Sequence, residues 1–204
     1  MTSKHIKILL LGNSAVGKTS LLMRYTKNEF QNNYISTSGY DCITKKLKMK
    51  NMNVVLQITD ICGQERFKSI SQQFYNKVDG FIFVFDVTNN ESFQEINNWL
   101  TDAQDKNNTF DYVIVGNKID LKDSIEIKRE DVANSNIFGN AKYFETSAKN
   151  NINVRESFEE LTKMILNRLK RTGSIADDEF NTVDTFSLSH SNHNSINEKK
   201  GCCF

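Results

Sequence analysis

The stretch Gly12-Asn13-Ser14-Ala15-Val16-Gly17-Lys18-Thr19 decides the fold of this chain. It fits the phosphate-binding pattern G-x-x-x-x-G-K-[ST] at every fixed position. The two glycines allow the backbone to curl, so that successive N–H groups point inward and form a nest for an anion. The pattern predicts that Lys18 reaches the β- and γ-phosphates of a nucleotide and that the Thr19 hydroxyl binds Mg²⁺. The predicted nucleotide-binding positions of this loop are Ser14, Ala15, Val16, Gly17, Lys18, Thr19 and Ser20.

The segments on either side of this loop support the prediction. Residues His5 to Leu11 are a mostly apolar run typical of a buried strand, and Ser20 to Lys27 is typical of the first turns of a helix. A helix that begins directly after the loop points its N-terminus at the phosphates, where its dipole and free N–H groups favour negative charge.

Strand and helix signals then alternate as far as Lys170. A period-two pattern over Ile43–Lys50, a turn at Asn51 and the run Asn53–Thr59 predict a hairpin. Further strands are predicted at Gly80–Val87, Tyr112–Val115 and Tyr143–Phe144. Two helices are predicted from apolar faces, one formed by Phe93, Ile96, Leu100 and Ala103 and one by Val154, Phe158, Leu161, Ile165 and Leu169. This order predicts an α/β fold with a six-stranded, mostly parallel sheet and one antiparallel strand.

Composition predicts one domain and a tail. The chain has 204 residues, a formal net charge of +1 and 38% hydrophobic residues, which suits a domain over 1–171. Residues 172–204 are rich in Ser, Asn and Thr and acidic overall, and they predict a disordered tether. The near-neutral charge argues against nucleic-acid binding. We expect no membrane span and no signal peptide, and the four cysteines indicate a reducing cytosolic compartment rather than a disulfide framework.

A phosphate loop alone does not choose a base, and the segment Asn117-Lys118-Ile119-Asp120 is the candidate for that choice. It follows a predicted strand, at the sheet edge where ligands bind in such folds. The Asp120 carboxylate can accept two hydrogens from guanine, whereas adenine offers no such donor pair. Lys118 can lie along the base, and Asn117 can tie neighbouring loops together.

Taken alone, this segment could be an ordinary polar turn. A second segment, Glu145-Thr146-Ser147-Ala148-Lys149, follows the next predicted strand and can direct backbone N–H groups at the guanine carbonyl oxygen. Ser147, Ala148 and Lys149 are therefore also predicted to bind the base.

These motifs together resemble a small GTPase of the Ras superfamily, and within it the Rab family. The resemblance covers residues 5–170 and the last few residues. It rests on GNSAVGKT at 12, TSG at 37, DICGQERF at 60, NKID at 117 and ETSAK at 145. The segments FVFDVT at 83 and NNINV at 150 are similar to secretory-pathway members in particular. The resemblance implies a three-layer P-loop GTPase fold with about five helices, GTP and GDP as bound nucleotides, and Mg²⁺.

The resemblance also implies roles for single residues near the nucleotide. Phe30 is expected to pack edge-on against the guanine, with a plain core position as the alternative, and Tyr34 to close over the phosphates. Thr37 is expected to bind Mg²⁺ only when a γ-phosphate is present, although Ser36 and Ser38 flank it and spacing barely separates the three.

The second switch carries the remaining expectations. Asp60 is expected to hold Mg²⁺ through water, and Gly63 to give its N–H to the γ-phosphate. Gln64 is the expected catalytic residue, orienting the attacking water. Intrinsic hydrolysis would then be slow, and a partner that donates an arginine would raise the rate by about 10³ to 10⁵.

The sequence departs from the family pattern in one region. The positions that match three aromatic residues commonly read by Rab effectors are Cys42, Thr59 and Phe74, so two of the three aromatics are missing. Large aromatic side chains anchor partners, and Cys and Thr cannot replace them. We expect a divergent set of effectors, and we expect Ile61 and Cys62 to alter the second switch.

The chain ends Gly201-Cys202-Cys203-Phe204, which is similar to the Rab signal for two geranylgeranyl groups. One lipid chain gives only marginal membrane binding, and an acidic tail cannot supply the second signal that stable attachment needs. Lipidated Cys202 and Cys203 would place the protein on the cytoplasmic face of an intracellular membrane, cycling through the cytosol. The implied partners are an exchange factor, a GTPase-activating protein, effectors, a prenylation escort and a dissociation inhibitor, and a monomer is expected.

The leading prediction is a GTP-hydrolysing switch that directs vesicle traffic. One alternative is a guanine-nucleotide-dependent scaffold that scarcely hydrolyses, which the altered switches suggest and the retained Gln64 opposes. A P-loop kinase or ATPase is the other, and the NKID and ETSAK segments argue against it.

Overall fold

A computed structural model describes residues 3–32, 39–49, 52–61, 73–135, 139 and 141–174. Several predicted functional residues therefore lie outside the described part of the chain: Tyr34, Thr37, Gly63, Gln64, Cys202 and Cys203.

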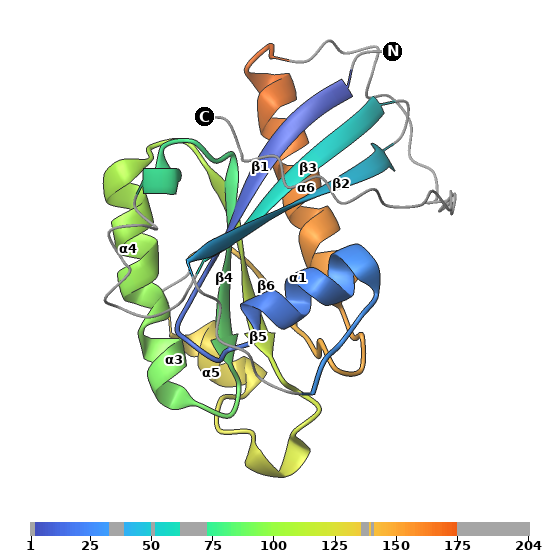
Figure 1. Cartoon of the computed structure of the whole chain (residues 1–204). Helices are drawn as coiled ribbons and strands as arrows, with labels where there is room; N and C mark the ends of the chain where they lie inside the picture. The colour runs from blue at the N-terminus through green and yellow to red at the C-terminus, as the bar shows by residue number, and fades with distance from the viewer. Residues whose placement is uncertain are drawn as a thin grey trace.

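The centre of the fold is a six-stranded sheet with the order β2-β3-β1-β4-β5-β6 (Figure 1). The strands are β1 (Ser3–Leu11), β2 (Tyr40–Met49), β3 (Met52–Ile61), β4 (Gly80–Asp86), β5 (Asp111–Asn117) and β6 (Lys142–Glu145). The pair β2–β3 is antiparallel, and every other neighbouring pair is parallel. The predicted α/β fold with one antiparallel strand is confirmed.

Helices cover both faces of the sheet, which gives three layers (Figure 1). The α-helices described are α1 (Lys18–Lys27), α3 (Asn90–Gln94), α4 (Ile96–Lys106), α5 (Arg129–Asn134) and α6 (Val154–Arg171), with a short 3-10 helix η2 (Lys122–Ser124). Helices α1 and α6 pack on one face, and α3, α4 and α5 pack on the other. The described part contains no helix with the length and apolar character that a membrane span requires.

Alternation along the strands builds a separate core on each face. In β4, Ile82 and Val84 join the core under α1 and α6, whereas Phe81, Phe83 and Phe85 join the core under α3 and α4. Successive side chains of a strand point to opposite faces, so a strand with both faces covered must be apolar throughout. The continuous apolar runs in the sequence have this cause.

The predicted helical faces are buried, with one difference in the backbone. Phe93, Ile96, Leu100 and Ala103 are all buried, but α3 ends at Gln94 and α4 begins at Ile96. Two short helices therefore bury the face that one longer helix was expected to bury.

The end of α6 is closed by a turn. Gly173 has φ 70, and the N–H of Ser174 donates to the carbonyl of Leu169 at 2.8 Å. Glycine tolerates this left-handed backbone, which satisfies carbonyls at the end of a helix. The helix itself ends at Arg171.

Candidate nucleotide-binding site

The predicted motifs converge at one edge of the sheet. The phosphate loop follows β1, the NKID segment follows β5, and the ETSAK segment follows β6. All of these strands are parallel, so their carboxyl ends lie at the same edge, where open α/β sheets bind ligands.

Two glycines are required by the packing of the phosphate loop. Gly12 has φ 140, and a Cβ there would lie 2.0 Å from the backbone oxygen of Val84. Gly17 has φ 99, and its Cβ would lie 2.3 Å from Nδ2 of Asn117. Both positions combine a backbone that other residues rarely adopt with a space that no side chain can enter.

Lys18 is the first residue of α1, and its side chain is buried beneath the phosphate loop. Its Nζ donates to the backbone oxygens of Gly12 and Asn13, both at 2.8 Å. The first turn of α1 contains no acidic residue, so the ammonium group and the helix N-terminus both favour an anion here. The other predicted positions lie on the same loop or in the first turn of the helix: Ser14, Ala15, Val16 and Ser20.

The two described residues that were predicted to bind the metal lie together. The hydroxyl of Thr19 donates to Oδ2 of Asp60, which is fully buried near the end of β3. Hydroxyl and carboxylate oxygens are the hard ligands that Mg²⁺ prefers, so this pair fits the ion. Among the described residues no group of three or more His, Cys, Asp and Glu could hold a metal. Substrate phosphates and water would have to complete the coordination of a magnesium ion at this pair.

Asn117 joins three loops through one buried side chain that is 2% exposed. Its Nδ2 donates to the backbone oxygen of Val16 at 3.0 Å. Its Oδ1 accepts from the Thr146 hydroxyl and from the N–H of Ala148, both at 3.2 Å. The phosphate loop, the NKID segment and the ETSAK segment therefore share one set of contacts.

The two predicted base-binding segments also meet at Asp120. The hydroxyl of Ser147 donates to Asp120 Oδ1 at 2.6 Å and accepts from the N–H of Asn150 at 2.9 Å. The N–H of Ser147 donates to the Ile152 carbonyl at 3.1 Å, and that of Ala148 donates to Asn117. A guanine carbonyl oxygen would have to share these N–H groups or accept from Lys149.

Phe30 was expected either to pack against the guanine or to be a plain core residue. It is half-buried against the core under α1 and α6, and the guanidinium carbon of Arg24 lies 5.9 Å from its ring centre. The residue therefore packs against the core and keeps part of its surface accessible.

Sequence reasoning missed two positioning contacts in this region. The indole N–H of Trp99 in α4 donates to Asn13 Oδ1 at 2.9 Å, which fixes the phosphate loop from the opposite layer. Nζ of Lys118 lies 2.6 Å from Oδ2 of Asp86, at the end of β4. Asp86 lies within the FVFDVT segment, but nothing in the sequence indicates that it contacts Lys118.

The three positions that match the aromatics read by Rab effectors lie in β2, β3 and the segment before β4. Cys42 and Thr59 face each other across the two strands, and Thr59 is only 8% exposed. The Phe74 ring packs 5.1 Å from that of Tyr40, which is 44% exposed. Tyr40 is therefore an exposed aromatic residue of this surface, and it is not one of the three positions considered in the sequence analysis.

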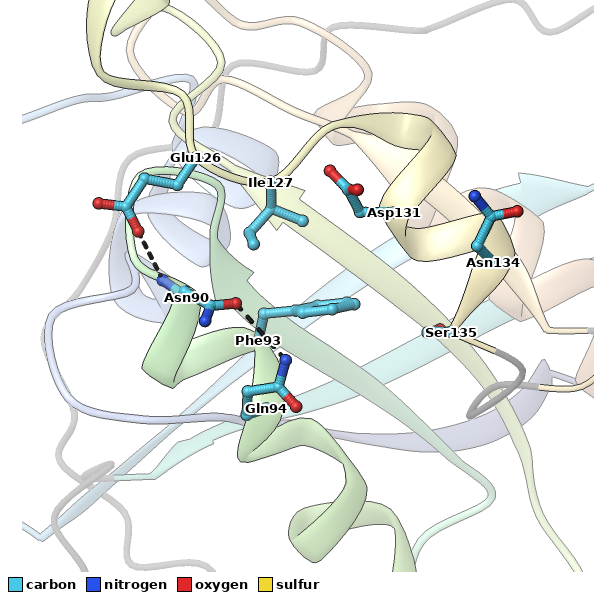
Figure 2. Close-up of a pocket in the computed structure, with 8 residues that line it drawn as sticks. All are labelled: Asn90, Phe93, Gln94, Glu126, Ile127, Asp131, Asn134 and Ser135. Carbon is cyan, nitrogen blue, oxygen red and sulfur yellow. Dashed lines mark hydrogen bonds between the residues drawn. The ribbon is translucent and has the colours of Figure 1, made fainter.

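A second hollow lies away from all of these motifs (Figure 2). It has a cavity volume of about 690 Å³ between α3 and α5, with Phe93 and Ile127 among its lining residues. Its polar lining consists of Glu126, Asp131, a serine and three amide side chains, and none of these belongs to a phosphate- or base-binding motif.

Comparison with known proteins agrees with this geometry. The Ras family model matches residues 7–167. The chain is 37% identical over 182 residues to the Ypt/Rab-type GTPase ypt7 of Schizosaccharomyces pombe, which covers 85% of this chain and 89% of that protein. It is 38% identical to the Ras-related protein Rab-3C of Bos taurus over 81% of this chain and 74% of that protein. It is 34% identical to the Ras-related protein RABE1e of Arabidopsis thaliana over 97% of this chain and 92% of that protein.

The fold and the joined loops define the class as a P-loop nucleotide-binding protein of α/β architecture. The chain belongs to the Ras family and, within it, to the Rab small GTPases. Members of this family hydrolyse GTP to GDP and phosphate.

Proposed function

We propose that this chain uses the site at the carboxyl edge of its sheet to bind GDP and GTP with Mg²⁺. As a Rab GTPase it is a GTP-hydrolysing switch that regulates vesicle traffic. The observation that supports the site most directly is the set of Asn117 contacts, because they bring the phosphate loop and both base-binding segments to one place.

The phosphates and the metal are bound at the start of α1. Lys18 and the backbone N–H groups of the loop stabilise the β- and γ-phosphates, and Thr19 and Asp60 hold the magnesium ion. Thr37 adds a ligand in the GTP state. Magnesium, when bound, neutralises charge that develops on the phosphate oxygens during hydrolysis.

The chain's own residues position the reacting groups. Gln64 orients the attacking water, Gly63 donates its N–H to the γ-phosphate, and Tyr34 covers the phosphates from the first switch. Family membership favours this switch over a scaffold that binds without hydrolysis.

The guanine base is selected by contacts along its edges and over one face. Asp120 accepts from the two guanine donors, the stem of Lys118 lies along the base, and Phe30 packs at its edge. The N–H of Lys149 supplies a donor for the guanine carbonyl oxygen, and those of Ser147 and Ala148 are shared between that oxygen and their acceptors in the protein, the Ile152 carbonyl and Asn117 Oδ1.

The test is to identify the nucleotide that the purified full-length protein releases on denaturation. GDP would support guanine selection together with hydrolysis. GTP would keep the base assignment but favour the scaffold. Adenine nucleotide, or no nucleotide and no GTP uptake on reloading, would contradict the site. The variant Asp120→Asn is the matched control, because an amide at this position donates to xanthine O2 and should shift the preference from guanine to xanthine nucleotides.

The GTPase domain is proposed to span 1–171, with 172–204 as a tether that carries the lipids. Geranylgeranyl groups on Cys202 and Cys203 would hold the protein on the cytoplasmic face of an intracellular membrane, from which a dissociation inhibitor returns it to the cytosol. A prenylation escort would be needed for the modification.

The regulators of a Rab protein are an exchange factor, a GTPase-activating protein and effectors. We propose that the effectors of this chain are a divergent set. Cys42 and Thr59 offer little accessible area, since Thr59 is 8% exposed, whereas the neighbouring Tyr40–Phe74 pair offers an aromatic contact. Ordinary-affinity binding of the GTP-loaded protein to an effector that depends on the usual three aromatics would contradict this.

A further inference from the structure

Asp86 is a buried carboxylate beside the base-binding segment and belongs to none of the five motifs. It ends β4, and its register partner in β5 is Asn117, so it lies level with the start of the NKID segment. The N–H of Val87 donates to the Asn117 carbonyl at 3.0 Å, which holds the two strand ends together. The ends of β4 and β5 are therefore joined directly beside Lys118.

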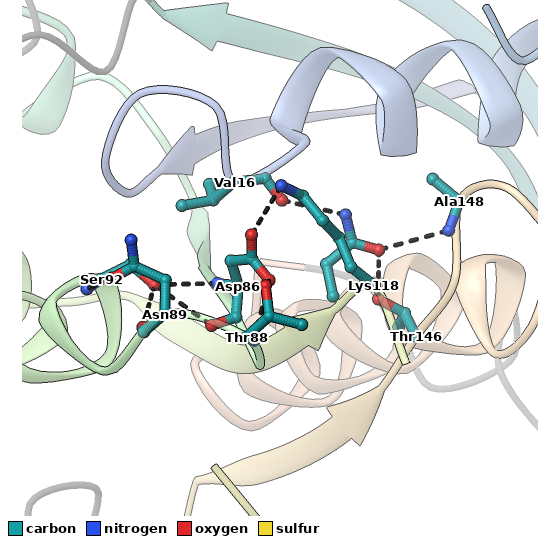
Figure 3. Close-up of polar contacts among 9 residues, drawn as sticks. Val16, Asp86, Thr88, Asn89, Ser92, Lys118, Thr146 and Ala148 are labelled. Carbon is teal, nitrogen blue, oxygen red and sulfur yellow. Dashed lines mark hydrogen bonds and ion pairs between the residues drawn. The ribbon is translucent and has the colours of Figure 1, made fainter. Parts of the chain in front are cut away.

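Local hydrogen bonds fix the orientation of this carboxylate (Figure 3). Oδ1 accepts from the N–H of Thr88 at 2.9 Å and from its hydroxyl at 2.7 Å. The backbone N–H of Asp86 donates to the Ser92 hydroxyl at 3.0 Å, and Ser92 is itself capped by Asn89. The turn into α3 thus leaves Oδ2 aimed at the neighbouring strand end.

Oδ2 of Asp86 holds the ammonium group of Lys118. The two atoms are 2.6 Å apart, and the side chains are 10% and 32% exposed, so the carboxylate is much better shielded than the lysine. Lys118 has φ 70, a backbone conformation that lysine rarely adopts. A lysine side chain loses rotamer entropy when it is fixed. An anchored ammonium group removes much of that loss from the binding step.

We infer that Asp86 is a positioning residue for guanine-nucleotide binding: it holds the stem of Lys118 where the stem can lie along the base. This inference rests on the proposed function, since it assumes that Lys118 contacts the base. The assignment concerns Asp86 alone, whose role does not follow from the motifs that identify the nucleotide site.

The test is the release rate of fluorescently labelled GDP from the full-length protein. The variant Asp86→Asn keeps an acceptor for Thr88 but removes the charge that holds Lys118. We expect release to become about tenfold faster, which corresponds to about 1.4 kcal/mol. In the background Lys118→Met, adding Asp86→Asn should change the rate less than twofold, because the group through which Asp86 acts is already absent.

A matched control is available at the other end of β5. Oδ2 of Asp111 lies 2.6 Å from Nε of Arg168, and these side chains are 15% and 17% exposed. The variant Asp111→Asn removes a comparable ion pair far from the base-binding segment, and it should leave the release rate unchanged. Thermal midpoints measured with saturating GDP identify any variant that fails to fold.

Each outcome decides the inference. A tenfold faster release that disappears in the Lys118→Met background supports it. An unchanged rate in Asp86→Asn, or an equal acceleration with and without Lys118, would overturn it, since the second result means that Asp86 acts through the fold. A wild-type protein that takes up no labelled GDP while remaining folded would refute the proposed function, and this inference with it.

Discussion

Replacing Asn117 with alanine is expected to damage stability and nucleotide retention together. The side chain makes hydrogen bonds to Val16, Thr146 and Ala148, and it is almost fully buried. A typical hydrogen bond contributes about 1 kcal/mol net, and a buried partner that is left unsatisfied costs about 1 to 3 kcal/mol. Water that enters the vacated space would recover part of this. We therefore expect a loss of about 3 kcal/mol in the free energy of unfolding.

The assay is urea unfolding of the full-length protein at one fixed concentration of GDP and Mg²⁺, with the release rate of labelled GDP measured alongside. Fixed ligand is required because bound nucleotide adds its own linkage term to the apparent stability. The Asn117→Ala variant should release GDP at least about 100-fold faster, since about 3 kcal/mol of contacts hold the three loops together.

The control is Asn107→Ala, at the end of α4. Asn107 also uses both ends of its amide, donating to the carbonyls of Tyr75 and Val78 and accepting from the N–H of Thr109. It should lower stability by about 1 to 3 kcal/mol and leave the GDP release rate within a factor of about two. Equal acceleration by both variants would refute the reasoning, because release would then follow global stability rather than the joined loops.

Three further predictions concern the glycines, a buried phenol and the carboxyl end. Gly12→Ala should lower the free energy of unfolding by about 3 kcal/mol or more, because it combines backbone strain with a Cβ 2.0 Å from the Val84 carbonyl oxygen in β4. Gly139 also has positive φ but no neighbour within 4 Å of an added Cβ, so calorimetry of Gly139→Ala should show a loss of only about 1 to 2 kcal/mol. Burial raises the pKa of Tyr143, whose hydroxyl has no hydrogen-bond partner among the described residues. Because the folded-state pKa lies above the unfolded value of about 10, the contribution of Tyr143 to stability is fully present below pH 10 and is lost as the pH rises further. Tyr143→Phe should therefore reduce the loss of stability at alkaline pH, and it should raise the free energy of unfolding in urea by about 1 kcal/mol at neutral pH. Replacing Cys202 and Cys203 with serine should move the protein from membranes to the cytosol on fractionation, and unchanged membrane association would contradict the lipid anchor.

The strands and the nucleotide loop could be predicted because their signals are local. The glycines of the phosphate loop and the apolar runs of β1, β4 and β5 lie within short windows of sequence, and each run matches the burial of a strand covered on both faces. The small helix α5 was not predicted. It has six residues, and Val132 is its single buried side chain, so it has no apolar period to detect.

The positioning contacts could not be predicted because they join residues that are far apart in the chain. Trp99 and Asn13 are separated by 86 positions, and the two residues meet only after α4 packs against the sheet. Asp86 and Lys118 meet because β4 and β5 are neighbours in register. Neither Trp99 nor Asp86 could be assigned a partner until the packing of the helices and the strand order were known.

The alternation of side chains along β3 explains how Thr59 and Ile61 can depart from the family pattern while Asp60 keeps its contact with Thr19. Thr59, Asp60 and Ile61 are consecutive in β3, so the side chain of Asp60 points to the opposite face from the other two. Asp60 faces α1 and meets Thr19, whereas Ile61 is buried in the core beneath α3 and α4, and Thr59 faces Cys42. Substitutions at 59 and 61 therefore lie on the face opposite Asp60 and leave its contact with Thr19 in place. This separation supports our proposal that the chain keeps the nucleotide chemistry of its family and binds a divergent set of effectors.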